Sequence, residues 1–182
     1  MILAFDTATT YGAVCGVTGG ATARAERAGD VLAAVDELVP DPGALEGIVV
    51  GRGPGSFTSI RIGLAVARTL SLALGVPVAG ASTLDAFDAG FAVLDARRGE
   101  VFARGPVACR PEELAVDGLV LVGDGALRYR ETFEAAGATV PPDDDPVHVP
   151  DPMLLLERAG PFGAAGLVEP LYVREPDAKP SA

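Results

Sequence analysis

The residues best suited to chemistry lie in a glycine-rich loop, Gly-Arg-Gly-Pro-Gly-Ser-Phe-Thr, at positions 51–58. An apolar run at 47–50 precedes this loop and a long apolar stretch at 56–74 follows it, which places the loop between a strand and a helix. Such junctions bind anions through the free N–H groups that begin the helix. The candidate nucleotide or phosphate loop comprises Gly53, Gly55 and Ser56, together with Asp6 and Thr7 at the end of the first expected strand.

This loop does not match the common nucleotide-binding motifs. A Walker A loop needs a lysine before its Ser or Thr, and the single lysine of the chain is Lys179. A dinucleotide fingerprint needs glycine where Ser56 stands and an acidic residue about 20 positions later, but no acidic residue occurs from Phe57 to Leu84. Ser56 also lacks the flanking glycines of a nucleophile elbow. A tight turn built on structural glycines remains the alternative to a phosphate site.

Composition narrows the possible functions. The 182 residues carry a formal net charge of −11, which argues against a protein that binds nucleic acid by itself. The single histidine, His148, is expected in a loop, and Cys15 and Cys109 form neither a disulfide framework nor a zinc site. We therefore expect no metal site and no cofactor, and we assign no catalytic residue.

The chain is expected to be soluble and cytoplasmic, without a membrane partner. Its first residues contain no basic segment and reach an acidic residue at Asp6, unlike a signal peptide. The most membrane-like stretch, 62–81, is interrupted by Arg68 and Pro77.

The apolar periodicity predicts the elements that position the loop. The first half begins with three antiparallel strands at 2–5, 13–17 and 21–27, followed by a helix at 30–39. A strand at 47–50, a long helix at 56–74, a strand at 76–79 and a short helix at 83–87 complete it. The second half has strands at 91–94, 100–104 and 118–122 and helices at 124–136 and 153–159. This order predicts an α/β fold with a mixed sheet, helices on both faces, and two lobes at 1–89 and 90–175. The tail at 176–182 is expected to be disordered.

The helix predicted at 56–74 is apolar on nearly every side, so it should bury two faces. One face can pack on the sheet, while the other face and the helix at 30–39 would leave surplus apolar surface, which marks a partner site. The candidate partner-interface residues are Leu32, Val35, Phe57, Arg61, Leu64, Ala65 and Arg68. The alternative is that the second lobe covers this surface.

The run GPGSFTSIRIGLAVA at 53–67 resembles the signature of the TsaB (YeaZ) family, G-P-G-S-F-T-G-[LI]-R-I-G-[LV]-A. Further segments resemble the family in the same order, at 2–8, 81–86, 94–102, 123–126 and 170–178. The chain departs from the pattern at Ser59, which replaces a glycine, in the start of the first helix at 28–32, and after Arg104, where relatives have a longer hairpin.

The resemblance implies the actin/Hsp70-like ATPase fold, with two ribonuclease-H-like lobes, of which the second is reduced in this chain. It implies a non-catalytic scaffold or activator subunit that forms a heterodimer with TsaD, the enzyme that transfers threonylcarbamoyl to the adenosine beside the anticodon of ANN-decoding tRNAs. A TsaE-like ATPase would join this complex, and tRNA would be contacted only through it. The helices at 30–39 and 56–74 would meet a matching pair on TsaD, or on a second copy in a homodimer when the chain is alone.

One enzyme of the same fold is kept as an alternative, a small-molecule kinase or ATPase in which Asp6 binds a metal or acts as a base. Such an enzyme needs a second phosphate loop after the lobe boundary, for which Asp124-Gly125 is the candidate. A peptidase, the third possibility, would lack both metal ligands and a base.

Overall fold

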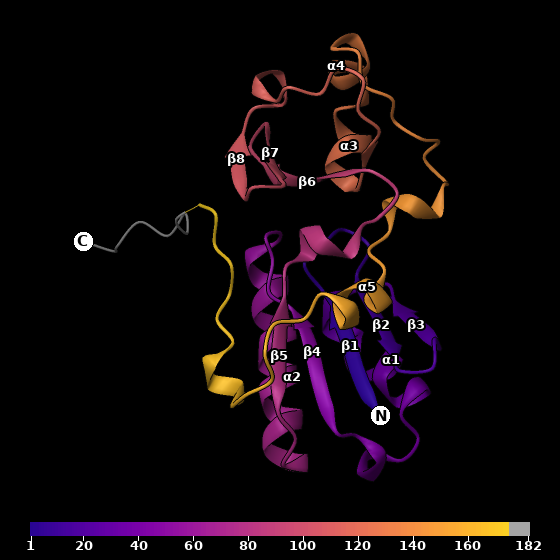
Figure 1. The fold of residues 1–182 in the computed structure, drawn as a ribbon, viewed down its shortest axis with the longest axis vertical. Helices are drawn as coiled ribbons and strands as arrows, with labels where there is room; N and C mark the ends of the chain where they lie inside the picture. The colour runs from indigo at the N-terminus through magenta and orange to yellow at the C-terminus, as the bar shows by residue number, and fades with distance from the viewer. Residues whose placement is uncertain (175–182) are drawn as a thin grey trace, which may run out of the picture.

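A computed structural model describes residues 1–174 of the chain, and the predicted tail at 176–182 lies outside them. The first sheet has the strand order β3-β2-β1-β4-β5 (Figure 1). Its strands are β1 (Ile2–Asp6), β2 (Ala13–Val17), β3 (Thr22–Ala25), β4 (Gly47–Gly51) and β5 (Val78–Ala81). β1, β2 and β3 pair antiparallel, whereas β4 and β5 run parallel to β1, so the predicted meander and mixed sheet are confirmed.

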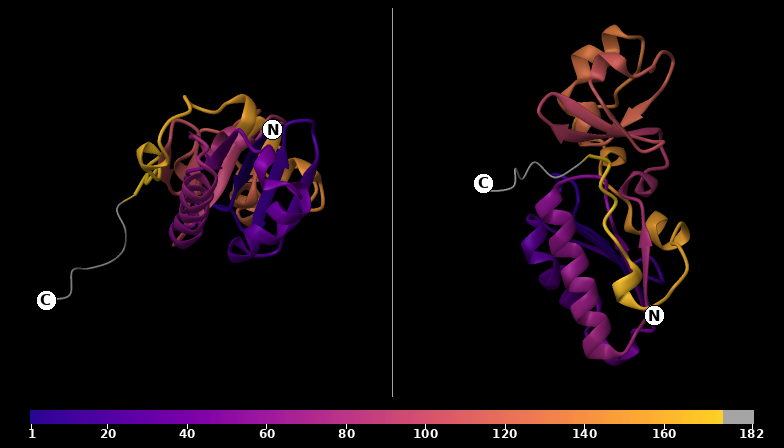
Figure 2. Two further views of the ribbon diagram at one scale, coloured as in Figure 1. Left: turned by 90° about the horizontal axis from the view of Figure 1, so that it is seen from below. Right: turned by 90° about the vertical axis from the view of Figure 1, so that its left-hand side faces the viewer.

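Helices cover both faces of this sheet (Figure 2). α1 (Val31–Leu38) and α2 (Phe57–Leu74) share one core with the sheet, while α5 (Pro152–Glu157) places Leu155 in the core of the opposite face. α2 begins where the Ser56 hydroxyl accepts a hydrogen bond from the Ser59 N–H at 3.4 Å, and it ends at Gly75, which has φ 70°. The predicted short helix at 83–87 is the 3₁₀ turn η3 (Thr83–Ala86).

The second sheet has the order β8-β7-β6-β9, with β6 (Phe91–Arg97), β7 (Glu100–Ala103), β8 (Val107–Cys109) and β9 (Leu121–Val122). Sequence periodicity did not predict β8, because it has only three residues and none of them is fully buried. The helix predicted at 124–136 is two short helices, α3 (Asp124–Arg128) and α4 (Arg130–Ala135), which break at Tyr129. The strand predicted at 118–122 is shortened to β9.

The chain returns to the first sheet after it completes the second. α5 packs against β1, β2 and β4, although it lies within the range predicted for the second lobe. The following residues run along the outer edge of β5, where the Gly160 N–H donates to the Gly80 carbonyl at 3.0 Å and Val78 pairs with Gly163. The first lobe is therefore built from both ends of the chain.

Within residues 1–174, α2 is the one helix whose length and composition would allow it to cross a membrane, a test that core helices of globular proteins also pass. Here α2 packs on β4, and both Arg61 and Arg68 lie on its exposed side. An exposed side that carries two guanidinium groups suits a protein partner or water better than lipid tails.

Candidate functional site

The glycines of the loop between β4 and α2 are required by close packing. A Cβ atom on Gly53 would lie 2.6 Å from Cδ1 of Ile60, and one on Gly55 would lie 2.3 Å from the Ala8 carbonyl oxygen. The Ser56 N–H donates to that same carbonyl at 2.8 Å, and the Gly53 N–H donates to the Thr83 hydroxyl at 3.2 Å. These two N–H groups are thus satisfied within the chain, as the structural-turn interpretation requires.

Asp6 lies inside the protein rather than at an opening. Its carboxylate accepts hydrogen bonds from the Ala8 N–H at 2.7 Å and from the Thr83 hydroxyl at 2.6 Å, and burial raises its pKa. The neighbouring Thr7 hydroxyl donates to the Ser59 carbonyl at 2.7 Å, which ties β1 to the first turn of α2. Asp6 therefore connects the loops that follow β1 and β5, and the Thr83 hydroxyl extends this connection to Gly53 after β4. Asp6 does not line the cleft described next.

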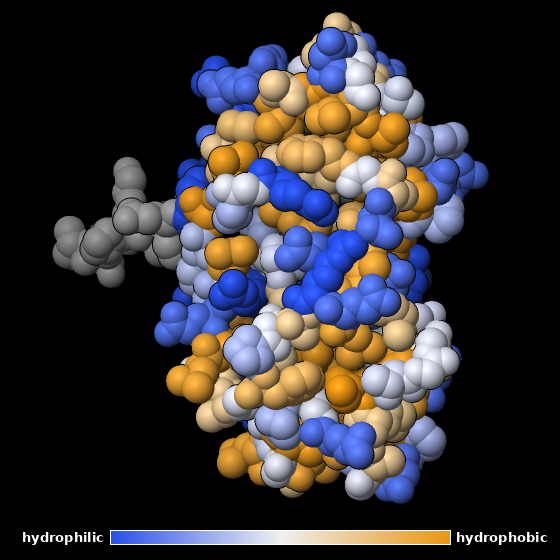
Figure 3. Space-filling view, in the orientation of Figure 1, coloured by the Kyte–Doolittle hydropathy of each residue, from blue (hydrophilic) through white to orange (hydrophobic). Residues whose placement is uncertain are grey.

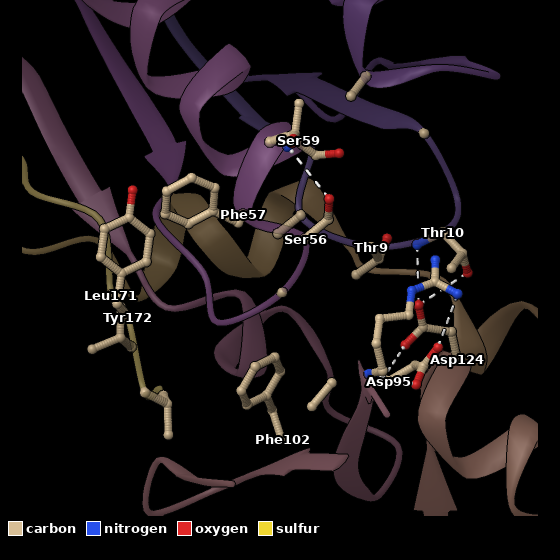
Figure 4. A pocket seen from close by; sticks show the side chains of 18 of the residues that line it. Thr9, Thr10, Ser56, Phe57, Ser59, Asp95, Phe102, Asp124, Leu171 and Tyr172 are labelled. Atoms are coloured by element: carbon tan, nitrogen blue, oxygen red, sulfur yellow. Dashed lines mark hydrogen bonds and ion pairs between the residues drawn. The ribbon is translucent and has the colours of Figure 1, made fainter. Parts of the chain in front are cut away.

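A cleft of about 660 Å³ lies between the two lobes (Figure 4). Thr9, Thr10, Ser56, Phe57 and Ser59 line it from the first lobe, Asp95, Phe102 and Asp124 from the second, and Leu171 and Tyr172 from the C-terminal segment. On the face seen in Figure 3, hydrophilic side chains form a band across the junction of the lobes.

At one side of this cleft a contact joins the lobes (Figure 4). The Asp124 carboxylate accepts hydrogen bonds from the N–H and hydroxyl of Thr10, at 3.0 and 2.9 Å, and from the Asp95 N–H at 3.0 Å. Asp95 is itself paired with Arg97 at 3.2 Å and with Arg128 at 3.8 Å. The acidic group of the predicted second phosphate loop, Asp124, and the neighbouring Asp95 are therefore both bonded to the chain itself. We call the Thr10–Asp124–Asp95 contact the latch.

The predicted partner-interface residues separate into two groups. Leu32, Phe57, Arg61, Ala65 and Arg68 are exposed. Val35 and Leu64 are buried in the core that α1 and α2 share with the sheet, so the structure does not offer them to a partner. The exposed residues of α2 form one stripe at helical spacing, which continues to Leu72, the most exposed of the large apolar side chains at 87%. The same spacing in the sequence would have added Leu72 to the predicted set.

The stripe stays exposed, although residues 165–172, which fall in the range predicted for the second lobe, contact part of it. Besides the sheet and η1 (Ala28–Asp30), the element in closest association with α2 is η6 (Ala165–Leu167), which belongs to the C-terminal segment. Phe57, at the first turn of α2, is the part of the stripe that reaches the cleft.

Comparison with known proteins places these features in a family. The TsaD family model, described as tRNA N6-adenosine threonylcarbamoyltransferase, matches residues 27–104. An uncharacterized protein of Mycobacterium tuberculosis is 38% identical over 174 residues, covering 91% of this chain and 82% of that protein. The tRNA threonylcarbamoyladenosine biosynthesis protein TsaB of Bacillus subtilis is 37% identical over 83 residues, covering 39% of this chain and 36% of that protein.

Solved structures agree over nearly the whole chain. YeaZ from Pseudomonas aeruginosa superposes with a TM-score of 0.74 at 25% identity, covering 94% of this chain and 98% of that one. A Pseudomonas aeruginosa protein described as similar to peptidase YeaZ gives a TM-score of 0.75. The chain is thus an α/β protein of the actin-like ATPase fold. Within that fold it belongs to the TsaB (YeaZ) family.

Proposed function

We propose that the chain is a non-catalytic scaffold or activator subunit, which pairs with a TsaD-like protein in the biosynthesis of threonylcarbamoyladenosine in tRNA. The observation that carries this proposal is the exposed stripe of α2, Phe57, Arg61, Ala65, Arg68 and Leu72, in a member of the TsaB family. Exposed apolar residues interspersed with arginines are typical of protein interfaces.

The nature of the match to TsaD supports a partner of related structure. The segment at 27–104 that matches the TsaD model contains α1, β4, α2 and β5. A protein built on that model would present a helix pair comparable with α1 and α2, so the two chains could associate about an approximate two-fold axis. The same argument allows a homodimer when no TsaD-like protein is present.

The state of the acidic groups supports a role without chemistry. The carboxylate of Asp6 is buried and bonded to Ala8 and Thr83, while those of Asp95 and Asp124 are bonded within the second lobe and to Thr10. None of these three carboxylates is presented to the cleft as an unpaired base or metal ligand. The transfer reaction and the contacts with tRNA would then belong to TsaD and a TsaE-like ATPase in a cytoplasmic complex.

The test is the variant Ala65→Arg, which puts a long cation in the middle of the stripe without touching the core. We expect this variant to fold and to bind the organism's TsaD-like protein at least tenfold more weakly, with a matching loss of tRNA modification by the assembled system. The matched control is Ala135→Arg, at an exposed position of α4 in the second lobe.

A folded Ala65→Arg protein that retains both partner binding and self-association would refute the proposed interface. Steady ATP hydrolysis by the isolated wild-type chain would instead favour the small-molecule kinase or ATPase.

A further inference from the structure

Residues 168–174, which we call the strap, run from the first lobe to the second (Figures 1 and 2). The Leu171 N–H donates to the Arg52 carbonyl at 2.7 Å, which attaches the strap to the end of β4. At its far end, Arg174 pairs with Glu100 and donates to the Ala96 carbonyl at 3.2 Å, both in the β6–β7 hairpin. The strap is thus anchored on both lobes.

The strap also contacts the exposed stripe of α2. The Arg68 guanidinium donates to the Val168 carbonyl at 2.9 Å, and the Arg61 Nε–H donates to the Tyr172 hydroxyl at 3.0 Å. The rings of Phe57 and Tyr172 stack with their centroids 5.0 Å apart, as Figure 4 shows at one side of the cleft. Three of the residues predicted for the partner interface therefore touch the strap.

The result is a surface stack of an arginine and two aromatic rings. The Arg61 guanidinium lies 4.0 Å from the centre of the Phe57 ring, on which Tyr172 stacks. Tyr172 remains 36% exposed and Phe57 37% exposed. Tyrosine and arginine are enriched among residues that dominate binding energy, and side chains already fixed in one arrangement lose less entropy when a partner binds.

Interface size argues that a partner on α2 must also cover neighbouring surface. An 18-residue helix is about 27 Å long and about 10 Å wide, so its outer face projects roughly 270 Å². A stable interface of standard size uses about 800 Å² of each partner. The strap lies directly against this stripe, is continuous with it through Phe57 and Arg61, and is therefore the surface that a partner seated on Ala65 meets next.

We propose that the TsaD-like partner binds a joint surface formed by α2 and the strap, in which Tyr172 contacts the partner directly. This inference rests on the proposed function. The strap is held at Arg52 and at Glu100, so we expect it to stay in place and contribute to binding. The alternative is that the partner displaces it.

The experiment measures the affinity of the full chain for the TsaD-like protein, for the wild type and three variants. Tyr172→Ala should weaken binding at least tenfold while its melting temperature stays close to that of the wild type. Tyr172→Phe, which removes only the hydroxyl that accepts from Arg61, should weaken it about two- to fivefold. The control is Leu119→Ala, since Leu119 is an apolar residue of matched exposure, 37%, in the second lobe.

The outcomes separate the two proposals. Unchanged affinity for Tyr172→Ala overturns the inference, and tighter binding overturns it in favour of a displaced strap. If Ala65→Arg abolishes binding while Tyr172→Ala does not, the proposed function stands and the joint surface is refuted. A wild-type chain that binds no TsaD-like protein refutes both. Should Tyr172→Ala fail to fold, Tyr172→Phe decides, and wild-type affinity for that variant counts against the inference.

Discussion

Replacement of Asp124 by alanine should loosen the junction between the lobes without unfolding the protein. The carboxylate makes three hydrogen bonds, two to Thr10 in the first lobe and one to the Asp95 N–H in the second. No other hydrogen bond described for residues 1–174 joins the β1–β2 loop to the second lobe. The latch is therefore a small contact with a defined position, and its loss can be measured.

The expected magnitude follows from which groups remain without a partner. Thr10 is exposed, so its N–H and hydroxyl return to water and each bond contributes only about 0–1 kcal/mol. The Asp95 N–H is partly buried, and leaving it unsatisfied costs about 1–3 kcal/mol. The charge of Asp124 also raises the pKa of Asp6, so its removal relieves some repulsion. We expect a net loss of about 1–2 kcal/mol, against about 5–15 kcal/mol for a typical domain.

Urea denaturation gives the change in the free energy of unfolding, and hydrogen exchange locates it. Protection of the Thr10 and Asp95 amides should fall roughly tenfold for each 1.4 kcal/mol of local opening, and by more than that of the β1 amides, which follow only the change in the global free energy of unfolding. Asp144→Ala removes a charge from an exposed loop and serves as the control. Unchanged protection of both amides in folded Asp124→Ala would show that the latch does not hold the lobes together.

Three further outcomes follow from buried groups. His148→Ala should lower the free energy of unfolding, measured in urea, by about 2–4 kcal/mol, because it leaves a cavity and removes the acceptor of the Gly123 N–H. His148→Gln should recover part of this loss. A loss below about 1 kcal/mol for His148→Ala would contradict the reasoning. Burial raises the folded-state pKa of Asp6 above 3.8. The wild type should therefore lose stability relative to Asp6→Asn as the pH rises from about 4 through that raised pKa. A difference in the free energy of unfolding between the two proteins that stays constant between about pH 4 and pH 8 would argue against this. Burial raises the pKa of Cys15 to about 12. A thiol reagent at about pH 8 should therefore modify Cys109 alone in the native protein, and both cysteines in denaturant. Rapid labelling of Cys15 in the native protein would be inconsistent with the structure.

The sequence predicted the elements whose signals are local. α2 was placed within one residue at its start, because Ser56 is a helix-capping residue and Gly75 a stop signal, both recognisable without tertiary information. The first sheet followed from short turns between β1, β2 and β3. Strand β5 begins two residues later than predicted, since Pro77 has no N–H to donate to the ladder.

Features that depend on contacts between distant residues could not be predicted from local sequence patterns. The latch joins Thr10 to Asp124, 114 residues apart, and the burial of His148 depends on its bond to the turn after β9. The helix was expected to bury two faces, so Leu64 was assigned to the interface together with Ala65. Arg61 and Arg68, which share the face of Ala65, were the signal that this face points outward and that Leu64 faces the sheet. The strap contacts of Tyr172 were beyond any local pattern.

The return of the chain to the first sheet has a consequence for protein synthesis. Among residues 1–174, the segment at 160–163 is the one that hydrogen-bonds to the outer edge of β5, at Val78 and Gly80. A ribosome therefore makes roughly 80 residues after β5 before that cover exists, which takes about 4–16 s. During this interval the nascent chain carries an open sheet edge, the kind of surface on which chains pair wrongly. Heterologous expression should therefore be sensitive to elongation rate and to chaperones that bind at the ribosome, even though the finished protein is small.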